Sequence, residues 1–242
     1  MEVLNDLLGY KNRKIYQDSD YFSFTLDSVL LANFVKINKS VSKILEIGAG
    51  TGAVSLILSL RTNKKIDAIE IQEYLSNLFK KSVYYNKLNE QINVIQDDVL
   101  NYYKSFNNYY DLIVCNPPYY NEKSRGKNYI SRHEEKLNID NLIRVSKKML
   151  NNKGKFVIVY DSSRMQEIFE KMKSNNLIPK RIMLVHDDYY HKASMFLLEC
   201  TKNGNDGLII EPPFLLKKEN GANTIIYNKI LSGGFLYESE KL

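Results

Sequence analysis

The sequence predicts an α/β protein with a seven-stranded, mostly parallel sheet and helices on both faces. Three observations lead to this fold class. From Lys43 onward, short apolar runs alternate with longer segments whose apolar residues recur at helical spacing. The connections between the early strand candidates are long enough for the right-handed crossover helices of a parallel sheet. The last two candidates are joined only by the short segment DYYHK, so we expect the last strand to be antiparallel.

The expected strands are short apolar runs, and the expected helices are longer and amphipathic. In chain order the strands are KILEI (43–47), KIDAIEI (65–71), INVIQ (92–96), YDLIVC (110–115), GKFVIVY (154–160), RIMLVHD (181–187) and ASMFLLEC (193–200). The helices are TLDSVLLANFVKI (25–37), TGAVSLILSLR (51–61), QEYLSNLFKKSVYYNKL (72–88), NLIRVSKKML (141–150) and SRMQEIFEKMKSNN (163–176). Thr25 is the expected N-cap of the first of these helices.

A chain of 242 residues is long enough for one substantial domain of this kind. We divide it into an N-terminal helical segment (1–42), the core sheet (43–201) and a C-terminal extension (202–242). The proline pair in LIIEPPF (208–214) follows the last strand, and we interpret it as a boundary or surface turn. The oligomeric state stays open, with a monomer as the simplest expectation.

Composition and charge limit the class of protein. Hydrophobic residues make up 44% of the chain and charged residues 26%, which is typical of a globular domain with a packed core. The net charge of +6 favours a polyanionic partner, of which nucleic acid is the commonest. No apolar run approaches the length of a membrane span, and the N-terminus does not resemble a signal peptide. We therefore expect a cytoplasmic protein without membrane contact.

The cysteines and histidines do not predict a metal site. Cys115 and Cys200 both lie in apolar runs, where we expect small buried residues. The three histidines are scattered, and no Cys/His cluster has the spacing of metal ligands. A nucleophilic role for the Cys115 thiol is an alternative that its expected burial disfavours.

A glycine-rich loop follows the first core strand in LEIGAGTGAV (45–54) and opens a helix. Gly48, Gly50 and Gly52 allow a tight turn and close approach of a ligand. Their G-x-G-x-G spacing differs from the G-x-G-x-x-G of dinucleotide sites. Glu46 beside the loop disfavours a pyrophosphate and suits a cationic group of a ligand. The alternative is a plain strand-to-helix turn.

Acidic residues end the next two strands. Glu70 ends the second strand, where a carboxylate can accept both hydroxyls of a ribose. Asp97 and Asp98 end the third strand, where one of them could accept a hydrogen bond from an adenine amine. The other could cap the following helix, and the residues alone do not decide between them. Together with the glycine loop, these acids predict a nucleoside ligand.

The fourth strand ends in CNPPYY (115–120), at the edge where such sheets bind ligands. The prolines hold the backbone extended and rigid. The Asn116 side-chain carbonyl and the Pro117 main-chain carbonyl could together accept both hydrogens of a planar NH2 group, while Pro118 stiffens the turn. Tyr119 offers a face for stacking a base, and Tyr120 either stacks or packs beneath the loop. The pattern predicts catalysis on an amino group, mainly through positioning.

At these residues the chain resembles the class I S-adenosylmethionine-dependent methyltransferases of the N-P-P-Y amino-group branch, over about residues 20–234. Within that branch it is similar to the bacterial valine-tRNA adenine-37 N6-methyltransferases. Three further segments carry this narrower resemblance: FTLDSVLLANF (24–34), SRHEEKLNIDNLI (131–143) and GANTIIYNKIL (221–231). The resemblance implies a Rossmann-like methyltransferase fold, S-adenosylmethionine as cofactor and the anticodon loop of tRNA as partner.

The resemblance also implies roles for individual residues. Glu46, Gly48 and Gly50 would flank the methionine part of the cofactor, and Glu70 would hold its ribose. Asp98 would hold the adenine amine, because the family's acid stands immediately before a β-branched residue, here Val99. The N-terminal segment would close over the cofactor. The remaining roles are Thr25 at the methionine end, Asn116 beside the reacting methyl group, and Asn116, Pro117, Pro118 and Tyr119 around the target adenine.

A polar segment after the tyrosines borders the expected target pocket. Its basic residues Arg132, Lys123 and Arg125 are candidates for phosphate contacts, in that order. Tyr119, Tyr120 and Tyr129 would suit unstacked bases of an anticodon loop. The alternative is an ordinary solvated loop.

Other functions share parts of this pattern. A methyltransferase acting on release-factor glutamine would use the same loop, but members of that group usually carry a larger N-terminal helical domain than the 42 residues found here. An enzyme acting on adenine or guanine in ribosomal RNA or DNA is a second alternative, disfavoured by the lack of an obvious added recognition domain. A non-enzymatic nucleotide-binding or RNA-binding module would keep the glycine loop but would not need Asn116.

Overall fold

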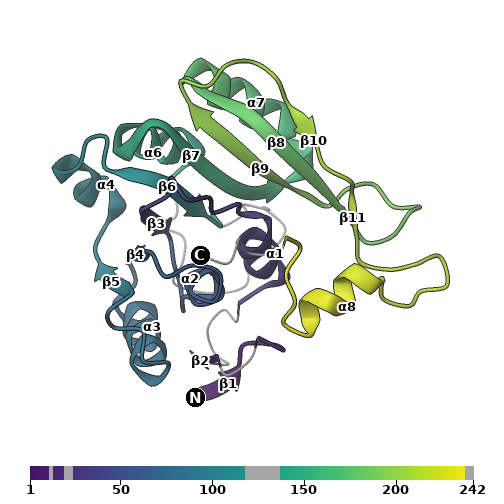
Figure 1. Ribbon diagram of the computed structural model, residues 1–242, viewed down its shortest axis with the longest axis horizontal. Helices are drawn as coiled ribbons and strands as arrows, with labels where there is room; N and C mark the ends of the chain where they lie inside the picture. The colour runs from purple at the N-terminus through teal and green to yellow at the C-terminus, as the bar shows by residue number, and fades with distance from the viewer. Residues whose placement is uncertain (11–12, 19–23, 118–136, 238–242) are drawn as a thin grey trace.

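A single twisted sheet organises the molecule in the computed structural model, which describes residues 1–10, 13–18, 24–117 and 137–237. The sheet has nine strands in the order β10-β8-β9-β7-β6-β3-β4-β5, with β11 also paired to β8. Helices cover both of its faces (Figure 1). The predicted α/β class and the mostly parallel sheet are therefore confirmed.

The core strands match the predicted runs closely. They are β3 (Lys43–Ile47), β4 (Lys65–Glu70), β5 (Ile92–Gln96), β6 (Tyr110–Cys115), β7 (Leu150–Asp161), β8 (Leu177–His186) and β9 (Met195–Lys202). The first five are parallel to one another, and β9 is antiparallel to both β7 and β8. The expected antiparallel last core strand is thus confirmed.

The central strands β3, β6 and β7 contain continuous apolar runs because helices bury them on both faces of the sheet. Along β6, Leu112 and Val114 join one hydrophobic cluster, while Ile113 and Cys115 join the other. The first cluster lies under α1 (Leu26–Phe34), α2 (Ala53–Leu58) and α3 (Glu73–Tyr85). The second lies under α4 (Val99–Tyr102), α6 (Ile139–Met149) and α7 (Met165–Ser174). Both cysteines are buried, as expected.

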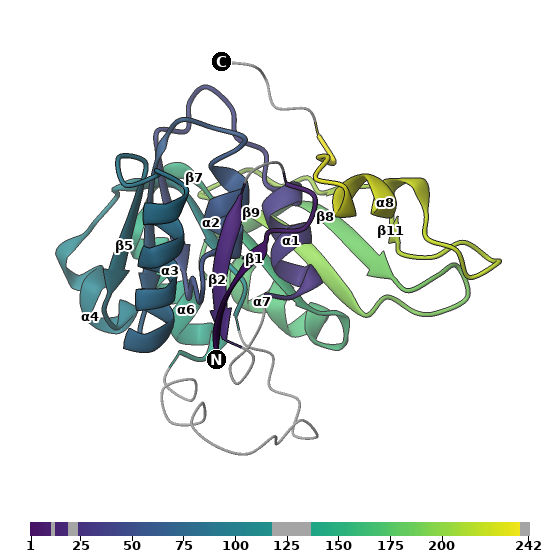
Figure 2. The ribbon, with the colours of Figure 1, turned by 90° about the horizontal axis from the view of Figure 1, so that it is seen from below.

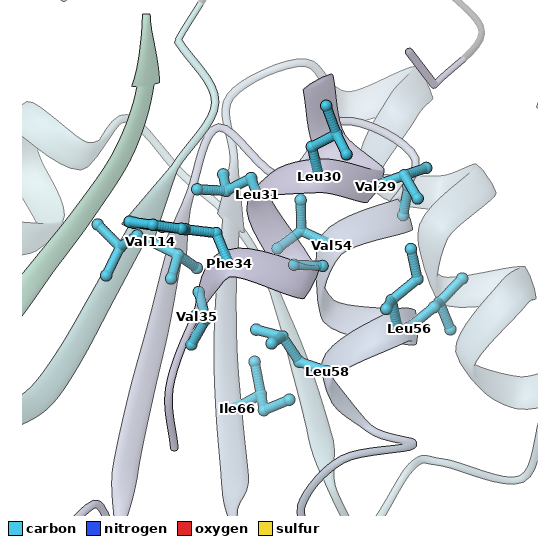
Figure 3. Packing of buried hydrophobic residues seen from close by; sticks show 14 of the residues in the cluster. Val29, Leu30, Leu31, Phe34, Val35, Val54, Leu56, Leu58, Ile66 and Val114 are labelled. Atoms are coloured by element: carbon cyan, nitrogen blue, oxygen red, sulfur yellow. The ribbon is translucent and has the colours of Figure 1, made fainter. Parts of the chain in front are cut away.

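Helix α1 is apolar almost all round because it is covered on several sides. Every residue from Val29 to Phe34 is buried. Figure 3 shows Leu31 and Phe34 directed toward Val114 of the sheet, with Val54 of α2 beside the helix. The C-terminal segment also touches α1, because the Leu236 backbone N–H donates to the Asn33 side chain at 3.1 Å. This packing fixes the first turn of α1, which reaches the site described below.

The N-terminal segment is less helical than expected. It contains α1, but it begins with an antiparallel pair of strands, β1 (Glu2–Asp6) and β2 (Lys14–Asp18). These strands lie beside α3 (Figure 2), where the Tyr16 backbone N–H donates to Ser82 Oγ at 2.9 Å. They escaped prediction because each strand has only five residues, with no regular alternation of polar and apolar residues.

The LIIEPPF segment is more than a boundary turn. Two-residue strands flank its prolines, β10 (Ile209–Ile210) and β11 (Phe214–Leu215), and both pair parallel with β8. Between them, Glu211 forms ion pairs with Arg181 at 3.3 Å and Lys36 at 3.1 Å. The segment therefore extends the sheet at its far edge, away from β6. The short helices η1 (Tyr103–Ser105), η2 (Ser162–Arg164) and α8 (Ile225–Leu231) complete the described fold.

None of the helices in the described part of the chain combines the length and apolar character needed to cross a membrane.

Candidate active site

The predicted site residues that the structure describes lie along one edge of the sheet. Strands β6, β3, β4 and β5 are neighbours, and their parallel registers set Cys115 level with Ile47, Ile47 level with Ile69, and Glu70 level with Gln96. Their carboxyl ends therefore meet at one edge, where parallel sheets bind ligands. The glycine loop, the two acidic strand ends and Asn116 all follow these ends, as the sequence predicts.

The glycine loop needs its glycines for two different reasons. Gly48, Gly50 and Gly52 all have positive φ, at 69°, 55° and 91°. A Cβ at Gly52 would lie 2.0 Å from the Phe79 ring of α3, so this glycine allows the close packing of two helices. A Cβ at Gly48 or Gly50 would meet nothing within 4 Å. These two glycines thus shape a loop with open space beside it, which suits close approach of a ligand.

Glu46 is a buried carboxyl group without a cationic partner in the described residues. Its Oε2 accepts hydrogen bonds from the Ser55 backbone N–H at 3.0 Å and from the Ser55 hydroxyl. Burial raises the pKa of Glu46 to about 8, against the opposing effect of the Ser55 hydrogen bonds, and the nearby charge of Glu70 adds slightly to the rise. A buried acid of this kind is stabilised in its charged form by a positive group on a ligand.

Glu70 connects the end of β4 to the glycine loop. Its Oε2 accepts from the Gly50 backbone N–H at 2.8 Å, and its Oε1 accepts from the Gln72 backbone N–H at 2.9 Å. Burial raises the pKa of this carboxyl group, while the backbone hydrogen bonds lower it. A carboxylate has about four acceptor sites, and backbone N–H groups of Gln72, Gly50 and Ile71 act on this one, so Glu70 keeps acceptor capacity for a ligand hydroxyl. The Gly50–Glu70 hydrogen bond is a contact that sequence reasoning missed.

The two aspartates after β5 make different hydrogen bonds. Asp98 is the N-cap of α4, because its Oδ1 accepts from the Leu100 backbone N–H at 2.8 Å. Asp97 Oδ1 accepts from the Asp98 backbone N–H at 2.7 Å. Both side chains are partly exposed. Asp98, and not Asp97, is therefore the residue that caps α4. Its Oδ1 makes the capping hydrogen bond, and its Oδ2 takes no part in that bond.

Asn116 is held by a residue that the sequence did not single out. Its Nδ2 donates to the Ser28 hydroxyl of α1 at 2.9 Å. The backbone N–H of Ser28 in turn donates to the Thr25 carbonyl oxygen at 3.2 Å. Thr25 is the N-cap of α1 by position, but its side chain makes no capping hydrogen bond. The first turn of α1 thus lies against Asn116, 88 residues away in the sequence.

The remaining catalytic-loop predictions fall mostly outside the described residues. Pro117 is described and buried. The residues that the structure does not describe are Pro118, Tyr119, Tyr120, Lys123, Arg125, Tyr129 and Arg132. Cys115 is buried, and burial raises the pKa of its thiol, so the alternative of a nucleophilic thiolate is disfavoured. Within the described ranges, no group of His, Cys, Asp and Glu side chains could hold a metal ion.

Two surface cavities lie elsewhere on the molecule. One, of about 570 Å³, is lined by residues around the end of α3, including Tyr84 and Tyr85. The other, of about 420 Å³, lies near the amino ends of β3, β4 and β5. Both are therefore at the edge of the sheet opposite Asn116. Neither contains a glycine loop or any predicted site residue, so we place the active site at the carboxyl edge.

The order of the strands and the glycine loop after β3 are those of a Rossmann-like, class I methyltransferase fold. A family model described as the methyltransferase small domain matches residues 24–178, and the chain belongs to this family. The match includes α1, the glycine loop, both acidic strand ends and Asn116.

Relatives with an assigned activity cover most of the chain. A protein of Cytophaga hutchinsonii named tRNA1(Val) (adenine(37)-N6)-methyltransferase is 28% identical over 187 residues, which are 76% of this chain and 79% of the relative. A protein of the same name from Shewanella woodyi is 24% identical over 221 residues, 87% of this chain and 90% of the relative. Another from Aliivibrio fischeri is 32% identical over 157 residues, 62% and 64% of the two chains.

Solved structures show the same fold. A predicted O-methyltransferase from Agrobacterium tumefaciens superposes with a TM-score of 0.71 at 18% identity, covering 88% of this chain and 99% of that chain. A putative transferase from Pyrococcus horikoshii gives a TM-score of 0.58 at 14% identity, covering 83% and 71%. At these identities the likeness concerns the fold alone.

Proposed function

We propose that this protein transfers a methyl group from S-adenosylmethionine to the exocyclic N6 amine of an adenine in tRNA, at position 37 of the anticodon loop of valine tRNA. The observation that carries the proposal is the placement of Asn116 at the same sheet edge as Glu46, the glycine loop and Glu70. The activity named for the relatives supports the choice of tRNA. The proposal includes a cytoplasmic location.

The residues at the carboxyl edge fit the parts of this cofactor. Glu46 is a buried acid suited to the cationic methionine end, and the space beside Gly48 and Gly50 admits a close ligand. Glu70 keeps acceptor capacity for the ribose hydroxyls, and the second oxygen of Asp98 is the candidate acceptor for the adenine amine. Thr25 lies at the first turn of α1 with its hydroxyl unused for capping, so it is the candidate contact for the methionine carboxylate.

When bound, S-adenosylmethionine supplies an electrophilic methyl group on a positively charged sulfur. The protein must then present the lone pair of the adenine N6 to that group. The Asn116 Oδ1 and the Pro117 carbonyl oxygen are the proposed acceptors of the two N6 hydrogens, which turns the lone pair toward the methyl group. After transfer, N6 carries a surplus proton that it releases to solvent, so a strong base is unnecessary. Positioning supplies most of the rate.

Ser28 contributes to this positioning. Because the Asn116 Nδ2 donates to the Ser28 hydroxyl, the Oδ1 of the same planar amide points the other way. A side chain anchored at one end loses less conformational freedom when it binds the amine. Ser28 is therefore a positioning residue, and its own place is fixed by the buried remainder of α1.

The target base and its neighbours require contacts from the segment after Pro117. We assign stacking on the target adenine to Tyr119 and a secondary stacking or packing role to Tyr120. Arg132, Lys123 and Arg125 are the proposed phosphate contacts. The net charge of +6 is consistent with a polyanionic substrate.

The experiment that tests this function compares possible substrates directly. The protein is incubated with labelled S-adenosylmethionine and, separately, with unmodified total tRNA, ribosomal RNA, DNA and a release factor. We expect label in tRNA, recovered as N6-methyladenosine after digestion to nucleosides. Label confined to the release factor would instead identify a glutamine methyltransferase, and label confined to ribosomal RNA or DNA would identify a different base-modifying enzyme.

A further inference from the structure

On one side of the site the sheet continues with the strands β7, β9 and β8, which are longer than β6. The parallel and antiparallel registers place Cys115 of β6, Ile158 of β7, Leu198 of β9 and Ile182 of β8 on one level across the sheet. β6 ends at Cys115, whereas β8, which runs in the same direction, continues to His186. Four further residues of strand add roughly 13 Å along the direction of β8. Because the sheet twists, this direction is turned away from that of β6, so the β8–β9 connection extends outward to the side of the carboxyl edge.

The loop of residues 187–194 joins the end of β8 to the start of β9 (Figure 1). It lies three strand positions from β6, roughly 14 Å across the sheet. Since the twist turns the end of β8 away from β6, the loop lies on the order of 25 Å from Asn116. A nucleic acid that places one base at Asn116 can reach this loop with neighbouring nucleotides.

The loop presents two tyrosines to solvent. Tyr189 and Tyr190 are 72% and 71% exposed, and their rings pack edge to face at 5.6 Å. Asp188 orders the loop beneath them, because its Oδ1 accepts from the backbone N–H groups of Tyr190 and His191 at 2.9 and 3.0 Å. The tyrosines are thus held outward on a structured turn, although large aromatic side chains are stabilised by burial.

Charged groups beside the tyrosines indicate the kind of partner. Lys192 and Asp187 are both exposed next to them, and His191 Nδ1 lies 2.6 Å from Asp188 Oδ1. Lys217 and Lys218 are exposed on the adjacent segment, whose Lys217 backbone N–H donates to the Asp187 carbonyl oxygen at 2.8 Å. Exposed aromatic faces together with basic side chains are the combination that proteins use to bind single-stranded nucleic acid.

We propose that the β8–β9 loop is a second contact surface for the substrate RNA, in which Tyr189 or Tyr190 stacks on an unpaired base outside the target pocket and Lys192 contacts the phosphate backbone. This inference rests on the proposed function. The β8–β9 loop would then recognise nucleotides around the target without touching the methylated base.

The test compares two pairs of exposed tyrosines. The variant Y189A/Y190A removes the proposed surface, and Y84A/Y85A is the matched control, since Tyr84 and Tyr85 are 77% and 49% exposed at the opposite edge of the sheet. For Y189A/Y190A we expect the KM for valine tRNA to rise about 5- to 100-fold, with kcat within about twofold of the wild type. The control should keep both constants, and all variants should bind S-adenosylmethionine normally by calorimetry.

Salt dependence separates stacking from phosphate contact. Fluorescence anisotropy of labelled valine tRNA gives Kd over a range of salt concentrations. Lys192→Ala should reduce the slope of log Kd against log salt by about one, whereas Y189A/Y190A should weaken binding without changing the slope.

The possible failures are distinguishable. If the wild-type protein methylates no tRNA, the proposed function fails and this inference fails with it. If the wild type methylates tRNA but Y189A/Y190A has a normal KM, or if the control loses as much affinity as Y189A/Y190A, only the inference is overturned.

Discussion

Glu46→Gln is the substitution that most directly examines the cofactor pocket. Glutamine has nearly the same shape and can still accept the hydrogen bonds from the Ser55 backbone N–H and hydroxyl. It cannot ionise. The variant therefore removes the titration of a buried acid while keeping its packing and its local hydrogen bonds.

The magnitude follows from the pKa of Glu46. Burial raises it from 4.5 to about 8 in the folded protein. Between these values the native state binds a proton that the unfolded state has lost, so stability falls as the pH rises from about 5 to about 8. The whole shift corresponds to about 5 kcal/mol of unfolding free energy, of which about 2–3 kcal/mol is lost between pH 6 and pH 8.

Urea denaturation of the ligand-free protein at pH 6 and pH 8 measures this term. The change in unfolding free energy between the two pH values should be about 2–3 kcal/mol smaller in Glu46→Gln than in the wild type. An identical pH dependence in both proteins would refute the burial of an uncompensated acid at this position.

Binding of the cofactor provides a second test of the ionisation of Glu46. At pH 7 an acid with a pKa near 8 is mostly protonated, so a cationic ligand that ionises it should release about 0.9 proton. Calorimetry in buffers of different ionisation enthalpy measures this release, which the variant should lack. The variant should also bind S-adenosylmethionine about 10- to 100-fold more weakly, through loss of a charged contact. Equal proton release in both proteins would place the cationic group elsewhere.

The remaining predictions concern the catalytic loop, the glycine loop and the RNA contacts. Asn116→Ala should abolish turnover while leaving the Kd for S-adenosylmethionine within about threefold, and near-normal turnover would remove Asn116 from catalysis. Ser28→Ala should lower kcat about 2- to 10-fold through loss of its 2.9 Å hydrogen bond, with partial rescue by Ser28→Thr, whereas an unchanged kcat would make the contact incidental. Gly52→Ala should destabilise the protein by about 2 kcal/mol or more in urea denaturation, because its Cβ would meet Phe79 at a positive φ, and a stable variant would contradict this packing. Arg132→Ala should weaken tRNA binding and reduce its salt slope by about one, and an unchanged slope would place the residue off the interface.

The sequence predicted the core of the fold well because the relevant signals are local. β3, β5 and β6 have the predicted bounds: β3 and β6 are apolar runs buried on both faces, and β5 is a short run of three apolar residues at the edge of the sheet. The β1–β2 pair and the two-residue strands β10 and β11 escaped prediction because they are too short to carry a period. Their pairing depends on packing against α3 and β8, which no local pattern encodes.

The site was predictable where a residue type and a strand end coincide. Glu46, Glu70 and Asn116 fall at neighbouring strand ends because the topology brings those ends together. Ser28 could not be found in this way, because its contact with Asn116 spans 88 residues and depends on how α1 packs on the sheet. The choice between Asp97 and Asp98 likewise depends on which carboxylate caps α4, and both residues fit the sequence pattern of a cap.

The proposed methyl acceptor is an adenine N6 amine in the anticodon loop. The most direct measurement uses valine tRNA made without modifications and a variant in which adenine 37 is replaced by guanine. Both are incubated with the protein and labelled S-adenosylmethionine, digested with a nuclease and examined by mass spectrometry of the fragments. We expect one added methyl group, as N6-methyladenosine, on the fragment containing position 37, and no methylation of the guanine variant. Equal methylation of both RNAs, or of neither, would contradict this expectation.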